Sequence, residues 1–479
     1  MDRISRRRFV ADSLLAVSTA AIPGAALALP ESRRTRRVSP NEQIRVAVIG
    51  FGGRGMNHIE AYLDMDDVVL ATICDADSAF FEKGLAAARK KGKREPTATQ
   101  DLRRVLDDKS IDAVSIATPN HWHALAAIWA LQAGKDVYVE KPVSHNVSEG
   151  RRIVEAARKY DRICQTGTQS RASAGIREAM EYLHSGRLGH IHLARGLCYK
   201  PRPSIGKVSG PQKPPASVDY DLWLGPAPMK PVMRQRFHYD WHWVWDTGNG
   251  DLGNQGIHEM DKARWGLNKP HLPYSFFSLG GRYGYVDDGE TPNTLVSFFD
   301  YGDSQLVFEV RGLPTKDFRG AKIGNIFYGD QGIMVMPSYS EAAVYDTRGN
   351  KVREFKGGGD HFRNFIDAMR SRRRENLYAD IEEGHLSSAL CHLGNISYLL
   401  RDGNGAALSQ LKSNPVAEDT VGRMLEHLAE NGVKLDTSTL GVGKVLAFGP
   451  KSETFPNDPK ANQLLTRPYR KGYEVPARV

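Results

Sequence analysis

Short, nearly continuous apolar runs alternate with amphipathic stretches over the first third of the chain. The apolar runs have the length of buried strands and lie at residues 44–49, 68–74, 111–117, 136–140 and 163–166. Apolar residues recur at helical spacing between them, near 56–64, 101–107, 122–133 and 148–160. Strands without a polar face, alternating with helices, are typical of a parallel sheet covered on both sides. The pattern predicts a Rossmann-type, doubly wound α/β domain over residues 44–167, with ligands at the carboxyl ends of the strands.

The pattern changes after residue 167. Residues 199–250 are rich in Pro, Trp and Gly, and the segments 294–299 and 305–310 read as separate strands. Such a change predicts a second domain of α+β class at 168–401, with a mainly antiparallel open sheet. Residues 402–479 are punctuated by Gly, Asn and Asp and are interpreted as a C-terminal extension.

The first residues are typical of an export signal. Ser5-Arg6-Arg7-Arg8-Phe9-Val10 resembles the twin-arginine signature, a modest apolar stretch follows, and Ala26-Leu27-Ala28 is a candidate cleavage site. We therefore interpret residues 1–28 as a twin-arginine signal peptide and 29–43 as a linker, and expect a periplasmic or otherwise exported protein. The alternative is a basic, disordered arm.

Composition and charge exclude several classes of protein. The chain has 479 residues with a net charge of +9, and five of these nine charges fall within residues 1–37. The remaining +4 does not indicate nucleic-acid binding. No run approaches the roughly 18 unbroken apolar residues of a membrane span, so we expect none. The four Cys are widely spaced without a C-x-x-C pair, so neither a disulfide framework nor a metal site is predicted.

A glycine-rich turn follows the first apolar run. Gly50, Gly52 and Gly55 form G-x-G-x-x-G between the expected strand and a helix, where a tight turn and free N–H groups bind a pyrophosphate. Asp75 ends the second apolar run, twenty residues after Gly55, where a carboxylate takes ribose hydroxyls and repels a 2′-phosphate. We therefore expect NAD as the cofactor. The expected cofactor-binding residues are Gly50, Phe51, Gly52, Gly53, Arg54, Gly55, Asp75, Thr118, Pro119, Asn120, His123, Glu140 and Lys141.

Three further motifs give the chain a family resemblance. They are Thr118-Pro119-Asn120-His121, Glu140-Lys141-Pro142 and Gly256-Ile257-His258-Glu259-Met260-Asp261. With the glycine turn and Asp75, they make residues 44–400 resemble the Gfo/Idh/MocA oxidoreductases. The N-terminal signature and the ending Ala461-Asn462…Arg467-Pro468-Tyr469-Arg470 resemble an exported branch of that family. The resemblance implies an NAD(P)-dependent oxidoreductase that acts on CH–OH groups. A homo-oligomer formed through the second-domain sheet is also expected.

Lys141, His258 and Asn254 are the expected catalytic residues. An ammonium at the end of a strand, by the cofactor, can stabilise a developing alkoxide, and the family has a lysine in this role. An imidazole can take the hydroxyl proton. Residues 254 and 258 share one face of an α-helix, but inositol dehydrogenase-like members carry Asp where this chain has Asn254. An amide cannot accept a proton, so the chain departs from an Asp–His pair here.

The expected substrate is a small carbohydrate. Gln169, Arg171 and Tyr199 lie in segments that resemble the substrate side of the family, and Trp241 lies in a run dense in aromatic and polar groups. Together with His258 these are the expected substrate-binding residues. The aromatic run can equally be core or interface. His121 and His123 do not share a helical face and have no third partner, which argues against a metal site.

Export narrows the expected reaction. Free NAD(H) is scarce outside the cytoplasm, so an exported enzyme has to hold its cofactor tightly and regenerate it in place. The first hypothesis is an oxidoreductase that removes hydride from a hydroxyl of a sugar, glycoside or polyol. The alternative is an NAD-retaining glycoside hydrolase that works by oxidation and elimination, because N-acetylgalactosaminidases of this kind belong to the superfamily. An epimerase and a catalytically silent sugar-binding module also stay open.

Overall fold

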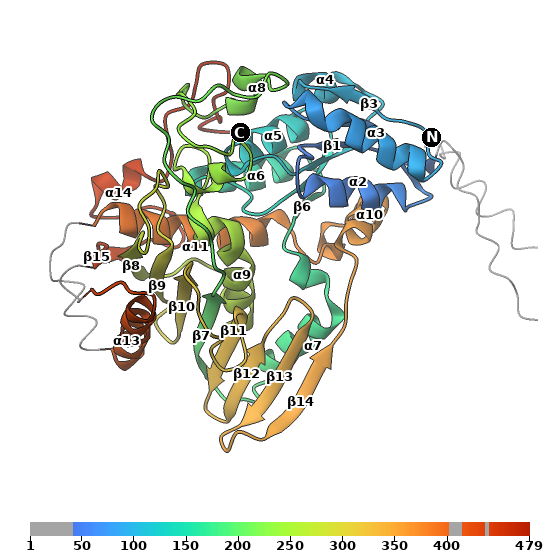
Figure 1. The fold of residues 1–479 in the computed structure, drawn as a ribbon. Coiled ribbons are helices and arrows are strands. Elements are labelled where there is room, and N and C mark those ends of the chain that lie inside the picture. Colours follow the sequence, from blue (N-terminus) through green and yellow to red (C-terminus); the bar gives the residue numbers. More distant parts are fainter. Residues whose placement is uncertain (1–41, 402–413, 436–439) are drawn as a thin grey trace, which may run out of the picture. The chain divides into compact units, whose positions relative to one another are not determined.

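The protein is described here from a computed structural model that covers residues 42–401, 414–435 and 440–479 (Figure 1). The expected export signal lies outside the described residues, as does all but the end of the expected linker. From residue 41 onward the chain forms one compact unit.

The first sheet is parallel throughout and has six strands in the order β3-β2-β1-β4-β5-β6. Its strands are β1 (Ile44–Ile49), β2 (Val68–Cys74), β3 (Thr97–Thr99), β4 (Ala113–Ile116), β5 (Asp136–Val139) and β6 (Cys164–Thr166). This is the strand order of dinucleotide-binding folds, whose ligand site lies where the order reverses, between β1 and β4. The predicted Rossmann-type sheet is confirmed.

Helices cover this sheet on both faces, as the alternating pattern predicted (Figure 1). They are α2 (Gly55–Leu63), α3 (Phe81–Lys90), α4 (Leu102–Asp107), α5 (Asn120–Gln132) and α6 (Val147–Lys159). Helix α3 and strand β3 were not predicted from the sequence. Strand β3 has only three residues, none of them fully buried, so it lacks the apolar run that marks the other strands.

The second sheet is mixed and mainly antiparallel, as predicted. Its strand order is β14-β13-β12-β11-β7-β10-β9-β8-β15, with β16 also paired to β8, and only β7 and β10 run parallel. The strands are β7 (Ile191–Cys198), β8 (Ser275–Gly281), β9 (Thr294–Asp300), β10 (Gln305–Arg311), β11 (Ile323–Gly329), β12 (Gly332–Met336), β13 (Glu341–Asp346), β14 (Lys351–Lys356), β15 (Gly441–Val442) and β16 (Leu446–Ala447).

Helices from several parts of the chain pack on this sheet. They are α7 (Ala174–His184), α9 (Ile257–Gly266), α11 (Ile381–Leu399), α13 (Pro415–Glu430) and α14 (Pro459–Gln463). Two further helices, α8 (Tyr220–Leu224) and α10 (His361–Ser371), lie instead on the nucleotide-binding half. Short 3₁₀ turns span Ser78–Phe80, Gln169–Ala172, Asp240–Trp243 and Arg374–Asn376. α7, α9 and α11 share one core with the sheet, and α13 covers the other face over β7–β10.

Two helices join the halves of the molecule. Helix α10 carries an apolar stripe, Phe362, Phe365 and Ile366, which is buried against the first sheet rather than the second. The Phe362 ring centroid lies 4.8 Å from that of His58 and 5.1 Å from that of Tyr138. Helix α11 contacts both α6 and α9. The domain boundaries proposed from sequence stay a prediction.

A buried carboxylate holds α13 to the second sheet. Glu309 is inaccessible to solvent and forms ion pairs with Arg195 at 2.7 Å, Arg423 of α13 at 2.9 Å and Arg311 at 3.2 Å. Burial alone would raise the pKa of Glu309, but the three guanidinium groups outweigh it and hold that pKa at about 2. The carboxylate is thus charged whenever the protein is folded near neutral pH.

Replacing Glu309 should reduce stability strongly and in a pH-dependent way. We expect Glu309→Gln to lower the free energy of unfolding by about 3–5 kcal/mol at pH 7, because three buried cations lose their counter-charge. The folded pKa lies below the ordinary 4.5, so this contribution is present above about pH 4.5 and is lost as pH falls toward 2. Denaturant titrations across pH measure it. Glu341→Gln removes a half-exposed partner of Lys356 and should cost less than about 1 kcal/mol; an equal loss in both variants would refute the role of Glu309.

Candidate active site

The glycine turn brings β1 against the loop that follows β4. Gly50 has a φ of +81°, and a Cβ there would lie 2.6 Å from the backbone nitrogen of Thr118. A Cβ on Gly55 would lie 2.0 Å from the carbonyl oxygen of Gly50. Only glycine fits at these two positions, because backbone occupies the space in which a side chain would stand. The space in front of Gly52 is taken by the ring of Phe80, 2.5 Å from a Cβ built there.

Asp75 is fixed beside this turn. Its Oδ2 accepts a hydrogen bond from the backbone N–H of Phe51 at 2.7 Å, and its Oδ1 accepts one from that of Asp77 at 3.0 Å. Burial raises the pKa of Asp75. The two backbone hydrogen bonds lower this pKa but do not cancel the effect of burial. The carboxylate lines the cavity and still has lone pairs for ribose hydroxyls.

A cavity of about 380 Å³ opens from the turn toward the second half of the chain. Of the expected cofactor-binding residues, all except Gly55 line it. Gly55 lies outside the cavity lining, and its missing side chain allows α2 to begin close to β1. Trp241 and Asn254 reach it from the second half. The structure therefore brings the predicted cofactor residues together with two residues of the predicted substrate and catalytic sets.

Lys141 enters the cavity at the carboxyl end of β5. Its Nζ donates a hydrogen bond to the backbone carbonyl of Asn254 at 2.7 Å. Burial lowers the pKa of Lys141, and the neighbouring Glu140 carboxylate opposes that shift. A lysine with a lowered pKa exchanges protons more readily near neutral pH than a solvated one.

Glu140 is buried and held from two sides. Its Oε1 accepts hydrogen bonds from Arg54 Nε at 3.1 Å and from His58 Nε2 at 3.1 Å. Burial would raise the pKa of Glu140, but the hydrogen bond from His58 and the charges of Arg54 and Lys141 hold that pKa well below 4.5. A Cβ on Gly167 would lie 2.7 Å from this carboxylate. Glu140 is therefore an anion locked beside Lys141.

A chain of hydrogen bonds leads from Tyr62 through Ser115 and His58 to Glu140, and each donor in it can be assigned. An ionised carboxylate only accepts, so the His58 Nε2 carries a proton. Burial lowers the pKa of His58, so its Nδ1 is unprotonated and accepts from the Ser115 hydroxyl at 2.8 Å. The Tyr62 hydroxyl donates to Ser115 at 3.2 Å. This buried chain runs from Tyr62 to Glu140 and fixes the carboxylate on which Lys141 depends.

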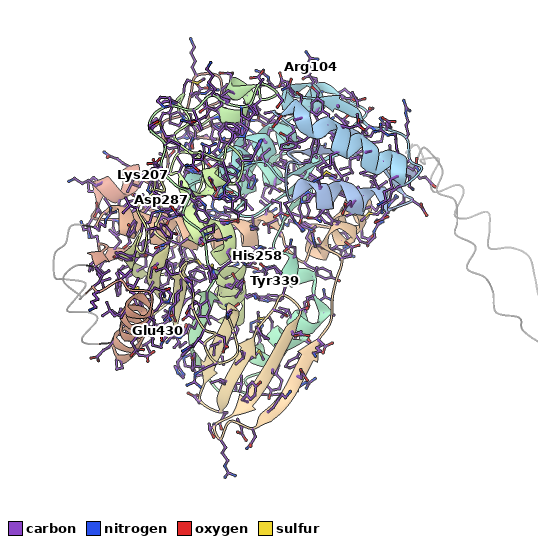
Figure 2. The ribbon with its side chains drawn as sticks, in the orientation of Figure 1. Arg104, Lys207, His258, Asp287, Tyr339 and Glu430 are labelled. Atoms are coloured by element: carbon purple, nitrogen blue, oxygen red, sulfur yellow. The ribbon has the colours of Figure 1, made fainter. Side chains whose placement is uncertain are left out.

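The segment before His258 is not α-helical. Leu252–Gly256 forms a π-helical turn that leads into α9. The α-helical spacing that put Asn254 and His258 on one face therefore does not apply. Asn254 lines the cavity, while the His258 ring lies 4.8 Å from that of Tyr339 (Figure 2). Burial, with the charge of Lys141, lowers the pKa of His258 well below 6.5. Its Nδ1 is buried without a partner among the described residues.

Several expected site residues lie in networks beside the cavity. Arg171 forms a bidentate pair with Asp261, with its Nε at 2.9 Å and 3.0 Å from the two oxygens, and its NH2 bonds Glu383 at 2.9 Å. The Tyr199 hydroxyl donates to Glu309 at 2.6 Å. Gln169 begins the 3₁₀ turn at 169–172. These three and His258 do not line the cavity, and their substrate role stays a prediction.

Sequence reasoning missed part of the lining. His242 stacks on Trp241 with ring centroids 3.6 Å apart, and burial lowers the pKa of His242 to about 3. Trp122, Trp223 and Tyr473 also line the cavity. The density of aromatic residues in 237–246 was a signal for His242. Nothing in the sequence placed the distant Tyr473 there.

The described residues contain neither a cluster of metal-ligating side chains nor a membrane-spanning helix. Residues 42–401, 414–435 and 440–479 contain no group of three His, Cys, Asp or Glu side chains placed to hold a metal ion. In the same ranges no helix is long and apolar enough to cross a membrane.

The parallel sheet, the glycine turn and Asp75 define a dinucleotide-binding Rossmann protein. Residues 44–168 match the family described as "Oxidoreductase family, NAD-binding Rossmann fold", and residues 191–275 match "Oxidoreductase family, C-terminal alpha/beta domain". Both matched stretches are those of Gfo/Idh/MocA oxidoreductases. The expected cofactor, NAD, is confirmed, because the matched family is described by its NAD-binding Rossmann fold.

Curated relatives match mainly through the nucleotide-binding part. A glycosyl hydrolase family 109 protein of Shewanella sp. (strain W3-18-1) is 36% identical over 125 residues, 25% of this chain and 27% of that protein. An alpha-N-acetylgalactosaminidase of Shewanella oneidensis is 34% identical over 127 residues, 26% of this chain and 28% of that protein. These matches span about a quarter of each relative.

Solved structures share the fold over most of the chain. The WlbA dehydrogenase from Bordetella pertussis, in complex with NADH and UDP-GlcNAcA, has a TM-score of 0.54 at 22% identity, covering 73% of this chain and 94% of that one. An NAD binding oxidoreductase from Klebsiella pneumoniae has a TM-score of 0.56 at 19% identity, covering 75% and 98%.

We expect the chain to bind NAD more tightly than NADP, because Asp75 repels a 2′-phosphate and Arg54 is engaged by Glu140. Asp75→Ala should weaken NAD binding about tenfold or more and narrow the NAD-to-NADP affinity ratio. Calorimetric titration of cofactor-free protein measures both. Asp107→Ala, an exposed carboxylate at the end of α4, is the control. Tighter binding of NADP by the unmodified chain would contradict the assignment.

Proposed function

We propose that this protein is an NAD-dependent oxidoreductase that removes hydride from a hydroxyl-bearing carbon of a sugar, glycoside or polyol, with a tightly held cofactor. The observation that carries the proposal is the buried Lys141 amine in the cavity that also contains the glycine turn and Asp75. Bound NAD would supply the hydride acceptor. The residues of the chain would have to bind the substrate, move its proton and exclude water.

Lys141 is proposed to act on the substrate hydroxyl. Among the described residues its Nζ has one hydrogen-bond partner, the carbonyl of Asn254, and an ammonium has three protons to donate. One of the others can therefore reach a hydroxyl in the cavity and stabilise the alkoxide as it forms. The Glu140 carboxylate favours the charged form of the amine, against the effect of burial, and the hydrogen-bonded chain from Tyr62 through His58 keeps Glu140 in place.

His258 is proposed as the proton acceptor. Its lowered pKa makes the imidazole neutral at physiological pH, which is the state a base requires. Its unpartnered Nδ1 supports this role. Asn254 is proposed to contribute through its backbone, by holding Lys141, since its side chain cannot act as a base.

The aromatic wall of the cavity supports a carbohydrate substrate. Trp241 and His242 stack as flat rings, which suit the C–H faces of a sugar. Gln169, Arg171 and Tyr199 remain proposed substrate residues.

A second candidate is an NAD-retaining glycoside hydrolase. The Shewanella relatives named as glycosyl hydrolases and as an alpha-N-acetylgalactosaminidase favour it. Both candidates begin by oxidising a sugar hydroxyl, so Lys141 would have the same part in each. They differ in whether a glycosidic bond is then broken.

Export and oligomerisation are two further proposals. We propose export by the twin-arginine route, from Arg6 and Arg7, which would favour a reaction that regenerates its own cofactor. We also propose a homo-oligomer through the second sheet. Because α13 covers β7–β10 on one face, the part of that face left for a partner is over β11–β13.

Lys141→Ala should lower kcat about 10²- to 10⁴-fold, because the developing alkoxide loses its donor. NAD content should be unchanged. In the unmodified enzyme the rate should rise as His258 loses its proton, so the acid limb should lie below pH 6.5 and be absent in His258→Ala. Lys351→Ala, at a half-exposed lysine of β14, is the control. Steady-state kinetics across pH measure these effects; an active Lys141→Ala enzyme would refute the mechanism.

The two candidates are separated by their products. The purified protein should be incubated with a panel of free sugars and p-nitrophenyl glycosides, with keto-sugar formation and p-nitrophenol release followed in parallel. Oxidation without release of the aglycone supports the oxidoreductase. Release that requires bound NAD supports the hydrolase. A panel with neither product would overturn both.

A further inference from the structure

A segment of the second half crosses the carboxyl ends of β2 and β3. This crossing segment (residues 217–225) is joined to the first sheet by backbone hydrogen bonds, from Ser78 to Ser217 at 3.0 Å and from Asp219 to Ala76 at 2.9 Å. The crossing segment therefore lies next to Asp75, the residue placed to take the adenosine ribose.

Helix α5 holds the middle of the crossing segment. The Trp122 Nε1 donates to the carbonyls of Leu222 at 2.9 Å and Trp223 at 3.0 Å. Gly225 lies flat on the indole, since a Cβ there would lie 2.1 Å from the ring. Any residue larger than glycine would push the crossing segment off α5.

The C-terminal part of the chain closes over the same segment. Arg470 donates to the Asp221 carboxylate at 2.7 Å, to the carbonyl of Asp221 at 2.9 Å and to that of Gly225 at 2.6 Å. The Tyr473 hydroxyl donates to the Asp221 carboxylate at 3.1 Å. The Tyr473 ring lies 5.6 Å from that of Trp122 and is 7% exposed. Charge-assisted bonds from one guanidinium to three acceptors make this a strong local clamp.

We propose that Tyr473 and Arg470 complete the binding site for the adenosine half of NAD and keep the cofactor from exchanging. Tyr473, Trp122 and Trp129 line one end of the cavity, and their π-faces suit a purine base. Arg470 holds the crossing segment over this end of the cavity by its hydrogen bonds to Asp221. The cofactor then leaves only when the crossing segment lifts, which requires the Arg470–Asp221 contacts to break.

The test is the rate at which bound NAD exchanges with labelled NAD in solution, together with the NAD content of the purified protein. Asp221→Ala, Arg470→Ala and Tyr473→Ala should each speed exchange about tenfold or more, because each removes part of the clamp. The Asp221 side chain is 58% exposed, so its substitution leaves the core intact. Asp221→Ala combined with Arg470→Ala should speed exchange by less than the product of the two single effects, since both variants break the shared contact between the Arg470 guanidinium and the Asp221 carboxylate.

Tyr469→Phe is the matched control. Tyr469 belongs to the same part of the chain, but its hydroxyl bonds Glu149 at 3.0 Å, away from the crossing segment. Its exchange rate should equal that of the unmodified protein. Unchanged exchange in the Asp221 and Arg470 variants would overturn the proposal, and so would equal acceleration by Tyr469→Phe.

The inference rests on the tightly held cofactor of the proposed function and not on its sugar chemistry. A protein that exchanges NAD slowly through this clamp, yet oxidises and cleaves no sugar, would refute the proposed activity alone. Rapid exchange in the unmodified protein would refute the clamp while leaving hydride transfer possible.

Discussion

The candidate site depends on one buried charge, the carboxylate of Glu140. An ionised carboxylate out of water is tolerable only with donors on its oxygens, and Arg54 and His58 supply them. In return the Glu140 carboxylate opposes the lowering of the Lys141 pKa that burial causes, and so favours the ammonium form. The position of Lys141, the proposed catalytic residue, thus depends on the residues that hold Glu140.

The same charge links the two halves of the molecule. Arg54 also approaches His361 of α10, 3.5 Å away, and His361 accepts or donates a hydrogen bond with the Tyr138 hydroxyl at 2.8 Å. Helix α10 comes from beyond residue 360 yet packs on the first sheet. Lys141 in turn bonds Asn254 of the second half. Nucleotide-binding and substrate-binding elements are therefore built as one unit around the cavity, rather than as modules joined by a linker.

The parts of the site that could be predicted from the sequence are those that short, contiguous motifs determine. The glycine turn, Asp75 and Glu140-Lys141 each lie at the end of an apolar run, and parallel strands bring such ends together. Tyr473, Trp122 and the crossing segment meet across 100 residues or more, which no periodicity encodes. The π-helical turn at Leu252–Gly256 also escaped prediction, because reasoning from α-helical spacing assumes the regular helix that it interrupts.

The covered adenosine end bears on the chemistry at Lys141. A cofactor that cannot leave has to be returned to its starting state within the same cavity. A neutral His258 can receive a proton and give it back, and Lys141 can stabilise charge in either direction of hydride transfer. Both proposed reactions satisfy this condition, the oxidoreductase with a second substrate and the hydrolase with its own intermediate. Retention of NAD is therefore the common physical requirement, and the fate of the oxidised sugar is what separates the two.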